Sequence, residues 1–320
     1  MMIKKEISDV IKKNRIFLIS THVNPDPDAL CSELALSEYL RSLGKKVHIV
    51  NEGVLAKRFE FFPGSKSIKS LKTVKTVPYD VAFILDCGDL GRIGKVKGVL
   101  NPERIMVNID HHVTNDRFGT INLIDIEASS TAEVIFDFLK YVRCNLNKSL
   151  ATNLYCGMMT DTGSFRYENT SSNTHSAVAE LLKYNINVNE LYHKIYETIP
   201  QHDLKVFTQI LDSFETYSQG RIICVELKRK WIEKISEDFD LRDAIFKFLR
   251  SILGVEVIFI LTEIKRKEIR VNFRSTSFVD VATIAHRFDG GGHKRASGCV
   301  VKKKMSEAKA IILKELSKAL

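Results

Sequence analysis

Short apolar runs alternate with helix-spaced apolar positions through the first half of the chain. Four mainly apolar runs are typical of strands buried in a parallel sheet: 16–20, 47–50, 81–85 and 105–109. Leucines recur at helical spacing from Ala29 to Leu43, and Gly44 follows as a helix-ending residue. Further helical patterns lie at 3–14, 130–142, 149–160 and 174–184. This alternation predicts an α/β domain whose mainly parallel sheet is flanked by helices and covered on both faces.

The second half of the chain has a different pattern. Residues 184–189 form a break, and 190–212 is helical apart from an interruption at Pro200, which predicts a linker helix. Strands are expected at 222–225, 255–261 and 269–273, the last two joined as a hairpin, with helices at 238–251, 279–288 and 306–319. Because 320 residues exceed one typical core, we expect three parts: a domain over 1–185, a linker over 186–212 and a smaller α/β domain with a mixed sheet over 213–320.

Polar residues gather where these predicted strands end. They are His22, Asp26 and Asp28 after the first run, Asp86 after the run 81–85, the triplet Asp110-His111-His112 at the run 105–109, and Asp161 at the end of the helix 149–160. Any one of them alone is more often a cap or turn residue. Ligands of open α/β sheets bind at the carboxyl ends of the strands, so these side chains can converge. Carboxylates and imidazoles without thiolates favour Mn²⁺ or Mg²⁺ over structural zinc.

Composition and charge narrow the class of protein. An apolar fraction of 44% and a charged fraction of 27% are ordinary for a soluble protein, and no apolar run approaches the roughly 18 residues that span a bilayer. The amino terminus begins an amphipathic helix rather than a signal core, and the six cysteines form no Cys-x-x-Cys pair. We therefore expect a cytoplasmic protein with reduced thiols and no membrane partner.

The positive charge is concentrated in the second part of the chain. The net charge is +9, and residues 211–320 hold 22 lysines and arginines against 15 acidic residues. A basic second part beside a near-neutral part with the acidic cluster suits an anionic substrate. The basic runs at 228–230, 265–267 and 302–304 are expected to be solvated surface.

A glycine-rich segment near the end of the chain indicates phosphate binding. Residues 290–292 are three successive glycines, which allow a ligand to approach main-chain N–H groups, although a plain glycine turn has the same composition. Arginine and histidine side chains add donors suited to phosphate. The predicted substrate contacts are Arg92, Arg274, Ser275, Gly291, Gly292, His293 and Arg295.

With these motifs the chain resembles the DHH/DHHA1 phosphoesterase superfamily, from His22 to Gly298. The segment 22–29 is similar to its first motif, Asp86 to the second, Asp110-His111-His112 to the third and Asp161 to the fourth, while Gly290-Gly291-Gly292-His293 matches the DHHA1 signature. The branch it resembles contains oligoribonucleases, phosphoadenosine phosphate (pAp) phosphatases and dinucleotide phosphodiesterases. Pro27 and Cys31 depart from the family's usual small residues, which affects the shape of the first loop.

The resemblance implies a centre of two divalent ions, with Mn²⁺ preferred and Mg²⁺ or Co²⁺ also suited. One ion would be bound by His22, Asp26 and Asp86, and the second by Asp28, Asp86, His111 and Asp161, so that Asp86 bridges the two. Asp110 would support this shell, and His112 would face the scissile phosphate. A distal phosphate would be held by Arg274, His293 and Arg295. Residues 1–185 would then be the catalytic DHH domain and 213–320 the substrate-binding DHHA1 domain.

The expected function is hydrolysis of short RNA or DNA oligonucleotides, or of linear or cyclic dinucleotides, to mononucleotides, with pAp phosphatase activity beside it. An inorganic pyrophosphatase shares the first motifs but not the glycine signature. A RecJ-like exonuclease is a further alternative, and we expect extra strand-tracking domains in such an enzyme. A non-catalytic nucleotide- or RNA-binding module is the least favoured alternative, because no metal ligand is missing. A homodimer through an apolar face such as that of 130–142 is compatible with the pattern.

Overall fold

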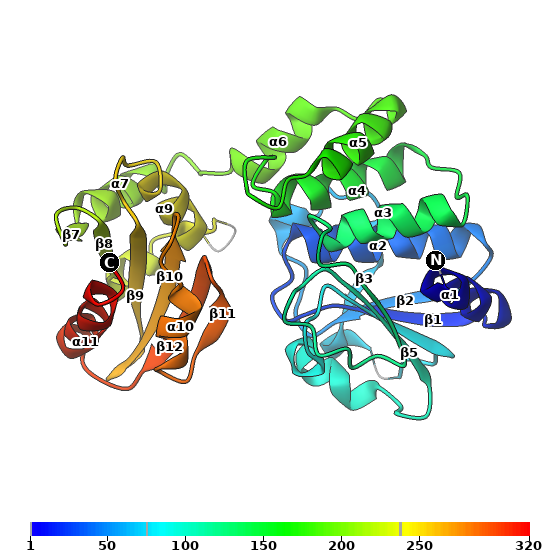
Figure 1. Cartoon of the computed structure of the whole chain (residues 1–320), viewed down its shortest axis with the longest axis horizontal. Helices are drawn as coiled ribbons and strands as arrows, with labels where there is room; N and C mark the ends of the chain where they lie inside the picture. The colour runs from blue at the N-terminus through cyan, green and yellow to red at the C-terminus, as the bar shows by residue number, and fades with distance from the viewer. Residues whose placement is uncertain (1, 75, 237–238) are drawn as a thin grey trace. The chain divides into compact units, whose positions relative to one another are not determined.

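The computed structural model describes residues 2–74, 76–236 and 239–320 of the chain. The chain divides into two compact units, Met1–Glu197 and Thr198–Leu320 (Figure 1). The boundary between the units falls inside the segment 186–212 that the sequence predicts as a linker. Among the described residues, no helix combines the length and the apolar character that crossing a bilayer requires.

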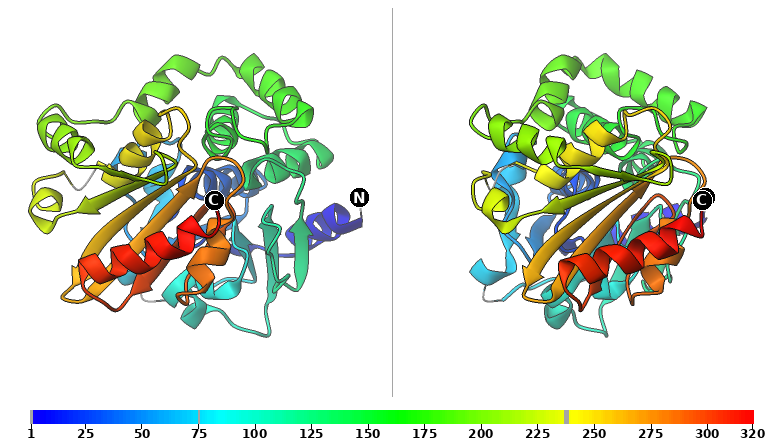
Figure 2. Two further views of the ribbon diagram at one scale, coloured as in Figure 1. Left: turned by 60° about the vertical axis from the view of Figure 1, so that its left-hand side comes forward. Right: turned by 90° about the vertical axis from the view of Figure 1, so that its left-hand side faces the viewer.

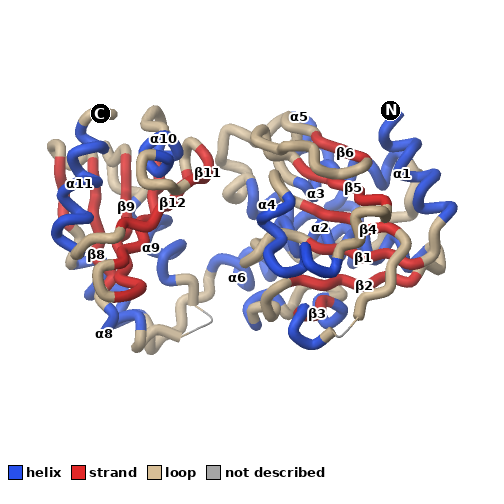
Figure 3. Tube along the Cα trace, turned by 90° about the horizontal axis from the view of Figure 1, so that it is seen from below, coloured by secondary structure: helices blue, strands red, loops and turns tan. Residues whose placement is uncertain are grey.

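The N-terminal unit is built on six parallel strands in the order β3-β2-β1-β4-β5-β6 (Figure 3). Four of them fall on the predicted runs: β1 (Ile16–Ser20), β2 (Lys46–Asn51), β4 (Val81–Leu85) and β5 (Ile105–Asp110). Two short strands were not predicted: β3 (Ile68–Ser70) and β6 (Ile121–Ile124). The strand order reverses between β1 and β4. In open α/β sheets such a switch point is where ligands bind.

Helices cover one face of this sheet. They are α1 (Met2–Lys13), α2 (Pro27–Ser42), α3 (Thr131–Tyr141), α4 (Lys148–Asp161), α5 (Ser172–Leu181) and α6 (Val188–Tyr196). Their apolar residues form one core with strand residues such as Phe17, Phe83 and Val107. The opposite face, including Leu18 and Ile84, is covered by 3₁₀ segments such as η3 (Leu71–Thr73) and η4 (Leu90–Val99). The prediction of a parallel sheet covered on both faces is confirmed, with α-helices on one face only.

The apolar face of α3 does not form an external surface. Val134, Ile135, Phe136, Phe138 and Leu139 are at most 3% exposed and belong to the core of the unit. The expectation that 130–142 offers a dimer surface is therefore wrong, because the sheet and the neighbouring helices already bury these side chains.

The C-terminal unit has a mixed sheet in the order β11-β12-β10-β9-β8-β7. Its strands are β7 (Glu215–Tyr217), β8 (Ile222–Leu227), β9 (Val257–Lys265), β10 (Glu268–Ser275), β11 (Gly291–His293) and β12 (Ala296–Val301). Strands β8 and β9 are parallel and the other pairs antiparallel, so the predicted mixed sheet and the β9–β10 hairpin are confirmed.

Helices pack on both sides of this second sheet. α7 (Leu204–Asp212) and α9 (Leu241–Leu249) share a core with alternate residues of β8 and β9. The opposite face packs against α10 (Val281–His286) and α11 (Met305–Ser317), as Figure 2 shows for α11. A short helix, α8 (Arg229–Ile232), follows β8. The helix predicted over 238–251 corresponds to α9, and its predicted first residue, Asp238, lies outside the described residues.

The predicted glycine loop is a hairpin. Strands β11 and β12 pair antiparallel, with Gly291 opposite Gly298. A Cβ atom on Gly290 would lie 2.3 Å from the Gly298 carbonyl oxygen, and one on Gly292, whose φ is +138°, would lie 2.5 Å from the Ala296 carbonyl oxygen. Both glycines are therefore required by close packing of the two strands, whether or not a ligand approaches them.

Candidate metal centre

Asp86 lies at the middle of the acidic cluster. It follows β4 directly with a φ of 54°, a left-handed conformation in which Asp is one of the better-tolerated residues. Its Oδ2 lies 3.4 Å from His22 Nε2 and its Oδ1 lies 3.8 Å from His111 Nε2. The two oxygens of one carboxylate thus face imidazoles that follow two other strands, β1 and β5. This is the arrangement that a bridging carboxylate needs.

The predicted ligands converge in two groups. His22, Asp26 and Asp86 form one group and Asp28, His111 and Asp161 form the other, each with its potential ligand atoms within 4.8 Å of one another. A third, overlapping group joins Asp86 to Asp110, His111 and His112. The structure thus brings together the side chains that the sequence places at the ends of β1, β4, β5 and α4. Their individual roles stay predictions.

The imidazoles are oriented as metal ligands are. His22 Nδ1 lies 3.0 Å from the Val23 carbonyl oxygen, and His111 Nδ1 lies 3.3 Å from the Ala128 carbonyl oxygen. A carbonyl can only accept, so each Nδ1 carries the proton in these contacts. In the neutral form that binds a metal, the Nε2 atom of each ring carries the lone pair and faces the carboxylates, as in metal sites whose ligating histidines are held by backbone carbonyls. Without a cation, the raised pKa of His22 keeps a second proton on its Nε2, which pairs with Asp86. The donor set therefore fits a divalent cation.

Three carboxylates of this cluster are held in an environment that disfavours their negative charge. Burial, followed by the charge of Asp86, raises the pKa of Asp26 and raises that of Asp28 well above its usual range. Burial, followed by the charge of Asp26, does the same to the pKa of Asp161. Bound cations would relieve this repulsion. Burial also opposes protonation of His22, but its hydrogen bond to Asp86 and the nearby carboxylates raise its pKa to about 9.

The N-terminus of α3 fixes two of the carboxylates. The backbone N–H groups of Thr131 and Ala132 donate to Asp28 Oδ2 and Oδ1 at 2.8 and 3.0 Å. The Thr131 hydroxyl donates to Asp86 Oδ1 at 2.9 Å. Negative charge is favoured at a helix N-terminus, so α3 orients both side chains. Sequence reasoning missed Thr131, although Ser130-Thr131 before an apolar helical run is a helix-start signal.

Asp110 forms a hydrogen bond to His112. Asp110 is fully buried, and its Oδ1 lies 2.6 Å from His112 Nδ1 and accepts the His111 backbone N–H at 2.8 Å. Its Oδ2 accepts from Asn115 Nδ2 at 2.6 Å. Burial opposes protonation of His112, but the hydrogen bond to Asp110 and the charges of Asp86 and Asp110 together outweigh it and raise the pKa of His112. Asn115 has no local sequence signal, and its role depends on the fold of the loop after β5.

The predicted substrate contacts fall in both units. Arg92, in η4, belongs to the N-terminal unit, where its carbonyl oxygen accepts the Val23 N–H at 2.7 Å and its charge opposes protonation of His112. In the C-terminal unit, the Arg274 guanidinium lies 4.9 Å from the centre of the Phe246 ring. In the strand register Arg274 is opposite Ala296, which is opposite His293, so all three share one face of the sheet.

Two of the predicted contacts have structural partners in the hairpin. Ser275 is 1% exposed, and its hydroxyl donates to the Lys294 carbonyl oxygen at 3.3 Å. Arg295 Nη1 donates to the Val279 carbonyl oxygen at 3.2 Å. These bonds attach the β11–β12 turn to neighbouring segments. Direct contact of either side chain with substrate stays a prediction, as it does for Gly291 and Gly292.

Comparison with known protein families identifies the class to which this fold and this cluster of potential metal ligands belong. Residues 16–158 match the N-terminal domain of the DHH family, and residues 229–320 match the DHHA1 domain. The chain belongs to the DHH family of phosphoesterases, which confirms the resemblance seen in its motifs.

Particular relatives place the chain more narrowly. It is 30% identical over 285 residues to the bifunctional oligoribonuclease and PAP phosphatase NrnA of Thermus thermophilus, covering 89% of this chain and 83% of that protein. It is 28% identical to the protein of the same name from Bacillus subtilis, with 93% of both chains covered. A crystal structure of an exopolyphosphatase-related protein from Bacteroides fragilis superposes with a TM-score of 0.92 at 26% identity, covering 99% of this chain and 96% of that one.

Proposed function

We propose that this chain is a metal-dependent phosphodiesterase that hydrolyses short oligonucleotides or dinucleotides to mononucleotides and also removes the 3′-phosphate of pAp. The observation that carries the proposal is the position of Asp86 between His22 and His111, at the junction of two ligand groups. The names of the relatives from Thermus thermophilus and Bacillus subtilis support this choice of substrates. The six free thiols suit a cytoplasmic location for the activity.

The metal chemistry suits this substrate class. Two divalent ions, with Mn²⁺ preferred and Mg²⁺ or Co²⁺ also suited, would supply an activated water and neutralise charge on the phosphate. His22, Asp26 and Asp86 would hold one ion, and Asp28, Asp86, His111 and Asp161 would hold the other. The oxygen and imidazole donors of this set match the preferences of these ions.

The protein side chains would then position and protonate the substrate. Asp110 keeps the proton on His112 Nδ1 and fixes the plane of the ring. His112 would donate a hydrogen bond to the phosphate or the leaving oxygen as negative charge develops there. Arg92 would add positive charge beside His112. In the C-terminal unit, Arg274 and His293 would hold a nucleotide or terminal phosphate distant from the reacting bond.

The direct test is a substrate panel of pApA, pAp and pyrophosphate, each with Mn²⁺ or with EDTA. We expect AMP from pApA and pAp with Mn²⁺ and no turnover with EDTA. Release of phosphate from pyrophosphate alone would contradict the proposal and favour a pyrophosphatase. Binding of the nucleotides without turnover would favour a non-catalytic module. The proposal also includes a homodimer, for which analytical ultracentrifugation is the measurement.

Replacement of Arg274 tests the role of the C-terminal unit. Arg274→Ala is expected to raise the KM for pApA about tenfold with little change in kcat, because a charge-assisted contact made before the chemical step is lost. Arg274→Lys keeps the charge but loses the planar group over Phe246, and we expect an intermediate KM. An unchanged KM in Arg274→Ala would remove this residue from the substrate contacts.

A further inference from the structure

On one face of the C-terminal sheet, the side chains of β10, β11 and β12 lie outside the hydrophobic core formed by the described residues, with Arg274 packed on Phe246 of α9. Along β10, Ile269, Val271 and Phe273 are fully buried in the core beneath α10 and α11. The residues between them, Arg270, Asn272 and Arg274, face the opposite side because successive strand side chains alternate. On that side the core beneath α7 and α9 includes residues of β8 and β9 and none of β10, β11 or β12, among the residues that the structure describes. We call the face of β10, β12 and β11 on that side the open strip.

The open strip is lined by donors over small side chains. In the strand register Arg274 is opposite Ala296, Asn272 opposite Gly298 and Arg270 opposite Val300. Val300 is 38% exposed, and Arg270 is exposed. A Cβ atom on Gly298 would lie 3.4 Å from Asn272 Nδ2, so the amide of Asn272 lies over that glycine.

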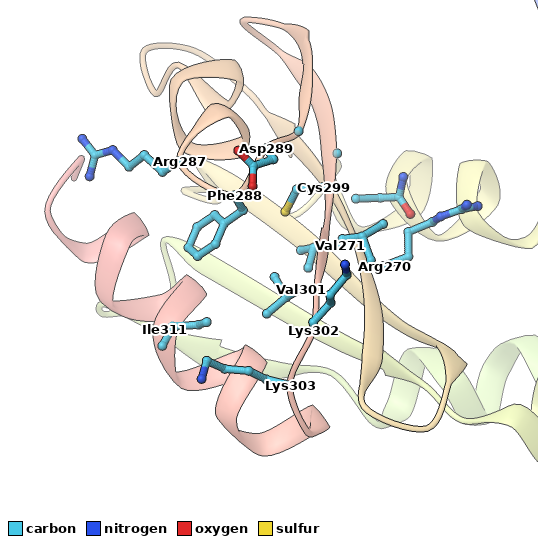
Figure 4. A pocket seen from close by; sticks show the side chains of 14 residues that line it. Arg270, Val271, Arg287, Phe288, Asp289, Cys299, Val301, Lys302, Lys303 and Ile311 are labelled. Carbon is cyan, nitrogen blue, oxygen red and sulfur yellow. The ribbon is translucent and has the colours of Figure 1, made fainter.

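Two cations at the end of the open strip, Arg270 and Lys302, have no acidic partner among the described residues. Arg270 and Lys302 both line a pocket of about 810 Å³ beside β12 (Figure 4). Within the described ranges of the chain, no carboxylate lies within ion-pair distance of either side chain. By contrast, Arg287, which lines the pocket from the end of α10, is paired with Glu315. The amide oxygen of Asn272 is buried and has no hydrogen-bond partner among the described residues. Arg270 and Lys302 can therefore take up an anionic ligand.

The spacing along the open strip suits a single strand of nucleic acid. Antiparallel strands rise about 3.4 Å per residue, so Arg270 and Arg274 are separated by roughly 14 Å along β10. The separation between the two arginines is longer than one nucleotide. Exposed sheet faces commonly bind single-stranded RNA through base stacking and phosphate contacts. Arginine planes can stack on bases as well as bind phosphates. Asn272 lies midway between the arginines, and its amide would have to turn outward for its buried oxygen to accept from a base or ribose.

We propose that the open strip, from Arg274 past Asn272 to Arg270 and Lys302, binds the nucleotides of an oligonucleotide substrate beyond the first two. This inference rests on the proposed function and deepens it. Arg270 and Lys302 then favour longer substrates over dinucleotides without taking part in the chemical step. The sequence predicts that the basic run 302–304 is solvated surface, whereas this proposal gives Lys302 a role in substrate binding.

The test is the double variant Arg270→Gln/Lys302→Gln, assayed with a dinucleotide and a pentanucleotide. We expect the KM for the pentanucleotide to rise about five- to tenfold, because two cationic contacts to phosphates are lost, while the KM for the dinucleotide changes by less than about twofold. The salt dependence of the pentanucleotide KM should also weaken. The control is Lys314→Gln/Lys318→Gln, at a residue of α11 and at the residue that follows α11, where Lys318 is paired with Glu315. Helix α11 packs on the opposite face of the sheet, and this control makes the same change in charge. This control should leave both KM values unchanged.

The outcomes separate this inference from the proposed function. If the unsubstituted protein hydrolyses both substrates and the double variant changes the two KM values equally, the open strip does not bind the additional nucleotides. The same conclusion follows if the α11 control reproduces the selective effect. If the unsubstituted protein hydrolyses neither substrate with Mn²⁺, the proposed function itself fails.

Discussion

Asp86→Ala is expected to lower kcat about a thousandfold or more while the protein remains folded. Metal ions contribute several kcal/mol of transition-state stabilisation, and each 1.4 kcal/mol corresponds to a factor of ten in rate. Asp86 belongs to the group with His22 and Asp26 and to the overlapping group with His111 and His112, so its loss is expected to affect the binding of both ions. The measurement is Mn²⁺-dependent hydrolysis of pApA, with metal content determined on the same sample.

The fold should tolerate this substitution. Asp86 is 3% exposed, and its charge is among those that raise the pKa values of Asp28 and Asp161. Its removal relieves this repulsion in the metal-free protein, which offsets the loss of its contacts with His22, His111 and His112. Asp86→Asn is the matched variant, because it keeps the shape and one acceptor for the Thr131 hydroxyl but lacks the charge. Near-normal turnover in either variant would show that Asp86 does not organise the centre.

Asp110→Asn is expected to lower kcat about a hundredfold, with two metal ions still bound. General acid–base groups typically contribute about a hundred- to ten-thousandfold, and Asp110 acts here through His112. The substituted amide can present its nitrogen to His112 Nδ1, which leaves the ring in the wrong tautomer or orientation. The measurements are kcat for pApA and metal content by elemental analysis.

His112→Ala provides the comparison for Asp110→Asn. If Asp110 serves to position His112, the double variant should be no slower than His112→Ala alone, because the two residues act as a unit. Loss of metal ions in Asp110→Asn, with activity restored by excess Mn²⁺, would instead assign Asp110 to metal binding.

The strands that carry the metal centre could be predicted from the sequence because they are long apolar runs ending in polar residues. β1, β4 and β5 each have five or six residues, and the parallel arrangement places their carboxyl ends at one edge. β3 and β7 have three residues each, too few for a periodic signal. The β11–β12 hairpin was not predicted because successive glycines are typical of a loop. In the structure, close packing of the two strands requires these glycines.

The hydrogen bonds that orient the carboxylates of the metal centre could not be predicted, because they join residues that are far apart in the sequence. The Thr131 hydroxyl reaches Asp86, 45 residues earlier, and the Thr131 N–H reaches Asp28, 103 residues earlier. The sequence pattern shows apolar faces and strand ends, but it does not show which helix N-terminus meets which carboxylate. The covered face of α3 was misjudged for the same reason, because a single apolar stripe does not reveal what packs against it.

The most direct measurement of the central claim is a crystal structure of the protein grown with Mn²⁺, with the ions located by anomalous scattering. The account predicts two ions about 3.5–4 Å apart, as in other two-metal sites, with one oxygen or both oxygens of Asp86 shared between them. His22 Nε2 should bind one ion and His111 Nε2 the other. A single ion, or ions bound without Asp86, would contradict it.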